Sequence, residues 1–137
     1  KKAQIIVDSL ILIDIPAHVL DDEAQLVFEL VLKNLYILTT NIAGIAIESG
    51  ANVEILRTHH LQLMHEVSCD IIKLQSSLTG KSFDQITLEK SMIKAFEGDL
   101  GHTCMGRSAP ARLNRALQLA KEFGLDLPAL QKIKHSS

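Results

Sequence analysis

One apolar stretch, residues 26–47, constrains the fold more than any other part of the sequence. The acidic residues 21–23 precede it and suit a helix N-terminus, and Gly50 follows it and suits a helix C-terminus. We therefore predict a long helix from Asp22 to Ser49. The stretch is interrupted by Glu29, Lys33, Asn34 and Asn41. Because these residues break the apolar run, we predict the central helix of a soluble bundle rather than a membrane span.

A stripe of polar or small residues follows one face of this predicted helix at about 100° per residue. The stripe consists of Glu29, Lys33, Thr40, Asn41 and Gly44. One interpretation is an exposed strip on which Glu29 pairs with Lys33 at i,i+4. The other is a polar cleft lined by Lys33 and Asn41, since buried polar groups need partners.

Four further helices are predicted from apolar periodicity, cap residues, glycine and proline. Their ranges are Asn52 to Ser77, Asp84 to Phe96, Pro110 to Phe123, and a short Leu125 to Lys134. Residues 1–20 are rich in β-branched residues and end near Ile15-Pro16, so we predict an extended segment or connector there, with a short helix as the alternative. Residues 21–137 are then one domain. The predicted class is all-α, a compact multi-helix bundle with two long helices.

Composition excludes several functional classes. The 137 residues are 47% hydrophobic and 22% charged, which is ordinary for a globular domain. A net charge of -2 and only 4% aromatic residues argue against nucleic acid or an anionic membrane as partner. Two cysteines are too few for a disulfide framework. We therefore predict a cytoplasmic protein.

Two histidine-containing segments could carry chemistry. His65 and Cys69 are separated by four residues, a spacing found in metal sites, but no further ligand motif accompanies them and we predict no metal. His102 lies in a glycine-rich segment that resembles the phosphorylatable histidine segment of phosphotransfer domains, although Met105 stands where those domains have lysine. His102 is therefore an alternative phosphoacceptor. Cys104, nearby, has no local base that would make it a nucleophile.

Short motifs in chain order resemble the C-terminal helical domain of ketopantoate reductases, within the 6-phosphogluconate-dehydrogenase-like group. That family has a lysine on a long helix followed by asparagines four and eight residues later, and here Lys33 is followed by Ile37 and Asn41. The later matches are Asn52–Leu56, Leu63-Met64, Ser91-Met92, Gly106-Arg107, Leu113-Asn114, Gly124 and Pro128. The family also has an acidic residue after Gly-Arg, whereas residues 108–111 contain no carboxylate.

The resemblance implies a substrate-binding and dimerisation domain of a reductase. Lys33 would be the catalytic proton donor, and Asn41, Ser91 and Asn114 would bind substrate. The chain has no glycine-rich nucleotide fingerprint, so NAD(P) would be held by a partner nucleotide-binding domain. Two alternatives remain open: a signalling or regulatory module with its own signalling partner, and a non-enzymatic bundle that forms a homodimer. We also expect the chain to form a homo-oligomer.

Overall fold

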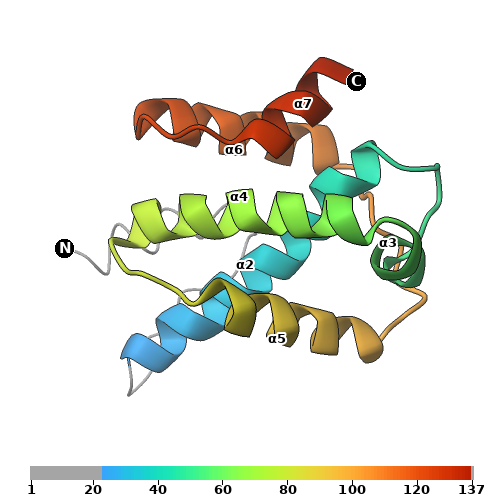
Figure 1. Ribbon diagram of the computed structural model, residues 1–137, viewed down its shortest axis with the longest axis horizontal. Helices are drawn as coiled ribbons and strands as arrows, with labels where there is room; N and C mark the ends of the chain where they lie inside the picture. Colours follow the sequence, from blue (N-terminus) through green and yellow to red (C-terminus); the bar gives the residue numbers. More distant parts are fainter. Residues whose placement is uncertain (1–22, 137) are drawn as a thin grey trace.

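The computed structural model describes residues 23–136, which form helices and no strand. The helices are α2 (Glu23–Ile45), α3 (Val53–His59), α4 (Leu61–Thr79), α5 (Gln85–Glu97), α6 (Ala109–Glu122) and α7 (Pro128–Ser136). They pack as a bundle in which α2 and α4 are the two long helices, which confirms the predicted all-α class (Figure 1). The extended segment predicted for residues 1–20 lies outside the described residues.

Helix α2 is the central element. Val31, Leu35, Leu38 and Ile42 recur every three to four residues and are fully buried. The helix contacts every other described helix, and Figure 1 shows it crossing behind α4. By length and hydropathy alone its segment Gln25–Ile45 could also cross a membrane, a test that the core helix of a soluble protein passes as well.

The predicted first helix is four residues too long at its C-terminus. Helix α2 ends at Ile45, where the amide of Ala46 donates to the carbonyl of Ala43 at 3.0 Å and closes a tighter turn. Gly50 lies beyond the helix, in the left-handed region with φ +80°. A side chain at Gly50 would be strained, so this glycine suits the connection to α3 rather than the end of α2.

The prediction of one continuous second helix was wrong. The segment forms two helices, α3 and α4, which are separated by His60. The backbone of His60 is not helical, with φ -133° and ψ 39°. Its amide still donates to the carbonyl of Leu56, while its Nε2 lies 2.8 Å from Oε1 of Glu48. No glycine or proline marks this break in the sequence. The side-chain contact of His60 with Glu48, twelve residues earlier, lies at the point where one helix ends and the next begins.

Side-chain oxygens cap three of the helices. Asn52 accepts from the amide of Ile55 at the start of α3, and Asp84 accepts from Thr87 at the start of α5. Asp70, in the middle of α4, accepts from the amides of Ala129 and Leu130 in α7. The third cap is tertiary, and it fixes the C-terminal helix against α4.

The loop between α5 and α6 packs against the C-terminal part of α2 and the start of α3. The carbonyl of His102 accepts from Val53, and the amide of Cys104 donates to Ala51, each at 2.9 Å. Gly44 lies beneath this loop, and a Cβ built on it would be 2.8 Å from the backbone nitrogen of Met105. Glycine is therefore needed at position 44 for close packing, not for backbone conformation.

Candidate functional site

An open groove of about 430 Å³ lies between α2 and α5 and reaches the following loop. It is lined by Glu29, Leu32, Lys33, Tyr36, Ile37, Ala95 and His102. Most of this lining is apolar. The volume falls within the range of small-molecule sites.

Lys33 is exposed at this groove. The neighbouring Glu29 accepts a hydrogen bond from Gln25, with 2.6 Å between Nε2 and Oε2. No ion pair joins Glu29 to Lys33 among residues 23–136, so the predicted surface pair is not formed. The Lys33 ammonium therefore remains available to an external anion or carbonyl oxygen.

Tyr36 supplies a second polar group to the same groove. Its ring packs edge-on against Phe96 at a centroid distance of 5.1 Å and lies 5.9 Å from the ring of His102. Burial, with smaller contributions from Asp99 and Cys104, raises the pKa of the Tyr36 phenol. The phenol is therefore protonated at neutral pH and can donate a hydrogen bond.

Asn41 belongs to the same i,i+4 row as Lys33 and Ile37, but its amide is used within the protein. Its Nδ2 donates to the carbonyl of Ile37 at 2.9 Å, and its Oδ1 accepts from the amide of Gly106 at 3.3 Å. It does not line the groove. The predicted polar stripe is thus divided: its first part faces the groove, and its second part holds the α5–α6 loop.

The two other predicted substrate-binding residues lie in different places. Ser91 is half-buried on α5, one turn before Ala95, and so shares the α5 face that borders the groove. Asn114 is exposed on α6 and does not line the groove. The structure therefore brings the helices of Lys33 and Ser91 together but leaves Asn114 apart.

His102, the alternative phosphoacceptor, is also at the groove. Its side chain is 47% exposed, and its Nδ1 lies 3.9 Å from the Asp99 carboxylate. Met105, three residues later, is exposed and stands where phosphotransfer domains have lysine. Phosphorylation of His102 stays a prediction.

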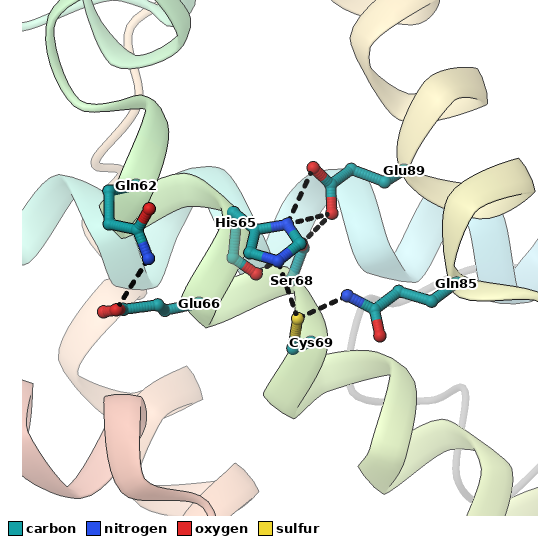
Figure 2. Close-up of polar contacts among 7 residues, drawn as sticks. All are labelled: Gln62, His65, Glu66, Ser68, Cys69, Gln85 and Glu89. Atoms are coloured by element: carbon teal, nitrogen blue, oxygen red, sulfur yellow. Dashed lines mark hydrogen bonds and ion pairs between the residues drawn. The ribbon is translucent and has the colours of Figure 1, made fainter.

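A second polar site, which we call the His65 cluster, consists of His65, Ser68, Cys69, Gln85 and Glu89 (Figure 2). The Nδ1 of His65 lies 2.9 Å from Oε1 of Glu89, and its Nε2 lies 3.6 Å from Sγ of Cys69. The hydroxyl of Ser68 has two acceptors within reach, the same Glu89 oxygen at 3.0 Å and the carbonyl of His65 at 2.8 Å. Gln85 Nε2 donates to the sulfur of Cys69. The cluster thus joins α4 to α5 through side chains that are far apart in the sequence.

A cavity of about 420 Å³ lies beside this cluster, between α4 and α7. It is lined by His65, Glu66, Cys69, Asp70, Pro128, Ala129 and Lys132. Figure 2 shows Glu66 turned toward Gln62, which donates to it at 3.0 Å. The cavity gives solutes access to the thiol and the imidazole.

The two cysteines have different environments. Cys104 is buried in the docked loop, and burial raises the pKa of its thiol to about 11. Cys69 is half-buried, and burial also raises the pKa of its thiol, while the hydrogen bond from Gln85 lowers it and three nearby carboxylates raise it. Only Cys69 has both a base and a cavity beside it.

The sequence indicated only two members of the His65 cluster, His65 and Cys69. The i,i+4 spacing of His65 and Cys69 placed them on one helical face. Gln85 and Glu89 also stand four residues apart, on α5, but nothing in their spacing indicates which face of α4 they meet. Among the described residues, no three His, Cys, Asp or Glu side chains are arranged to hold a metal ion.

Comparison with known proteins adds no relative. No family model, no curated protein and no solved structure matches the chain. The fold defines an all-α bundle domain. Function is therefore inferred from the two sites and from the short motifs described above.

Proposed function

We propose that this domain forms one wall of the substrate site of an NAD(P)-dependent reductase of the ketopantoate reductase type. The observation that carries the proposal is the position of Lys33, an exposed ammonium on an apolar groove between α2 and α5. The resemblance assigns the same residue as proton donor. Ser91, a second residue of the resemblance, is on the helix that forms the opposite wall.

Three of the helix starts offer no free amides to the phosphates of a dinucleotide. Asn52, Asp84 and Asp70 already occupy the amides at the starts of α3, α5 and α7, where phosphates commonly bind. Under the proposal the cofactor, which supplies hydride in this class of enzyme, is held by a separate nucleotide-binding domain. The groove then contributes substrate binding and proton donation only.

The side chains of the groove have defined tasks in this scheme. Lys33 donates a hydrogen bond to the carbonyl oxygen of the substrate and gives up a proton as that oxygen becomes an alkoxide. Tyr36 offers a second donor in the same groove. Leu32 and Ile37 contact the carbon chain of the substrate. Because Ile37 replaces an asparagine and residues 108–111 lack a carboxylate, the groove suits a less polar oxo acid than a fully matching site would.

Binding of a branched-chain 2-oxo acid tests this function. Titration with 2-oxo-3-methylbutanoate, followed by NMR, is expected to shift the resonances of Leu32, Tyr36 and Ala95. Lys33→Ala is expected to weaken binding at least about tenfold, because a charge-assisted hydrogen bond is lost. Lys121→Ala, which removes an exposed lysine from α6, is the matched control and leaves the affinity unchanged.

Two results would count against the proposal. Equal affinities of the wild type and Lys33→Ala would remove Lys33 from the site. Resonance shifts confined to residues outside the groove would place the ligand elsewhere. Circular dichroism of each variant separates loss of binding from loss of structure.

A further inference from the structure

The His65 cluster has the geometry of an activated nucleophile and is separate from the Lys33 groove. A thiol, a base and a group that orients the base follow one another as Cys69, His65 and Glu89. We propose that Cys69 is a modification site that reacts with hydroperoxides, with His65 as its base and Glu89 as the residue that orients His65. This inference does not depend on the proposed reductase function.

Hydrogen bonding determines the protonation of His65 in the cluster. The Glu89 carboxylate can only accept hydrogen bonds. The Nδ1 of His65, 2.9 Å away, is therefore the protonated nitrogen. The lone pair of Nε2 faces the sulfur of Cys69, which is the arrangement needed to remove the thiol proton.

The reaction can be written with these groups alone and one peroxide. The thiol proton of Cys69 moves to Nε2 of His65, and the sulfur attacks one oxygen of hydrogen peroxide. The O–O bond breaks as the S–O bond forms, and the departing hydroxide takes the proton from His65 to give water. The sulfur is oxidised to a sulfenic acid, and the peroxide is reduced.

Two features of the cluster favour a peroxide over an acyl substrate. The amides of Ala129 and Leu130, the backbone donors at the α7 end of the cavity, already bind Asp70 and cannot stabilise an oxyanion. The carboxylates of Glu66 and Asp70 line the cavity and disfavour anionic reagents, with Lys132 as the one opposing cation in its lining. A small neutral oxidant needs neither an oxyanion site nor a cationic pocket.

The thiol of Cys69 depends on its base for reactivity. Burial and the nearby carboxylates raise the pKa of this thiol, so it is protonated at neutral pH. Proton transfer to His65 is then the step that creates the nucleophile, and Glu89 stabilises the resulting imidazolium. Gln85 donates to the sulfur and favours its anionic form.

The rate of sulfenic acid formation tests the proposal. The folded protein is treated with hydrogen peroxide at pH 7, dimedone traps sulfenic acid, and peptide mass spectrometry reports Cys69 and Cys104 separately. Cys69 is expected to react at least about tenfold faster than the same cysteine in an unstructured peptide of residues 64–74. His65→Gln is expected to bring the rate down to that of the peptide, while His59→Gln, at an exposed histidine outside the cluster, leaves it unchanged.

Glu89→Gln provides a second test should His65→Gln fail to fold. It removes the carboxylate that holds Nδ1 and is expected to lower the rate at least threefold while the thiol and the imidazole remain. A folded His65→Gln or Glu89→Gln variant that reacts as fast as the wild type would overturn the mechanism. A wild-type rate no higher than that of the peptide would overturn the site as a whole.

Discussion

The two ends of the polar stripe on α2 look alike in the sequence and differ in the structure. At the first end, Lys33 is exposed on a groove and has no ion pair with the nearby Glu29. At the second end, the amide oxygen of Asn41 accepts from Gly106 of the α5–α6 loop and its nitrogen donates to Ile37 within α2, while Gly44 lets the backbone of the loop approach closely. Periodicity finds the stripe, but the neighbouring elements decide whether a polar side chain is free for a ligand or required for packing.

This difference changes how the resemblance applies to the chain. Lys33 lines the groove, and Ser91 is on α5, the helix whose Ala95 forms the opposite wall, although Ser91 itself does not line the groove. Asn41 would have to break its hydrogen bond to Gly106 before it could bind one. Under the proposed function, substrate contact therefore belongs to the Lys33 end, whereas Asn41 contacts the α5–α6 loop.

The largest expected effect is at Gly44. Gly44→Val is expected to destabilise the fold by about 3 kcal/mol, because the new side chain overlaps the backbone of Met105 and the Cβ of Cys104. Urea unfolding followed by circular dichroism measures the change. The control is Gly101→Val, since nothing lies within 4 Å of a Cβ at that position. Equal stability of the two variants would mean that the loop does not pack on Gly44.

A smaller effect distinguishes Asn41 from Lys33. Asn41→Ala is expected to cost about 1–1.5 kcal/mol of stability, since two side-chain hydrogen bonds are lost, one to the amide of Gly106 in the loop and one to the carbonyl of Ile37. Lys33→Ala should change stability by less than about 0.5 kcal/mol, because it removes an exposed side chain. Chemical denaturation of the two variants measures both changes. A larger loss of stability in Lys33→Ala than in Asn41→Ala would contradict the difference between the two ends of the stripe.

The smallest effect is at Asn34, a polar residue of α2 that faces neither the groove nor the loop. It is fully buried, and neither atom of its amide has a hydrogen-bond partner among the described residues. Asn34→Leu is expected to stabilise the protein by about 1 kcal/mol, because an unpaired amide is replaced by an apolar group of similar size. Thermal unfolding measures the gain. A lower melting temperature would show that this amide has a stabilising partner.

Much of the fold could be predicted because it depends on local chemistry. The starts of α5 and α6 were predicted to within a residue, since Asp84 caps one helix and Pro110 suits the first turn of the other. The break at His60 could not be predicted in this way. His60 is neither glycine nor proline, and its contact is with Glu48, twelve residues earlier in the chain.

The candidate sites were also predictable only where they depend on local sequence patterns. Lys33 could be selected from its place on an apolar helix, and His65 with Cys69 from their spacing. The amide of Asn41 could equally have faced a substrate, and only the docked loop shows that it does not.

By itself the sequence determined the all-α class, the central position of α2 and the residues on each helical face. These properties follow from a repeat of 3.6 residues and from caps that act within a few residues of one another. Only the tertiary structure decided which faces meet. It placed Glu89 beside His65, the 104–106 loop on Gly44, and Lys33 on an open groove. The physical reason is that such contacts depend on how helices distant in the sequence pack together, which no local pattern encodes.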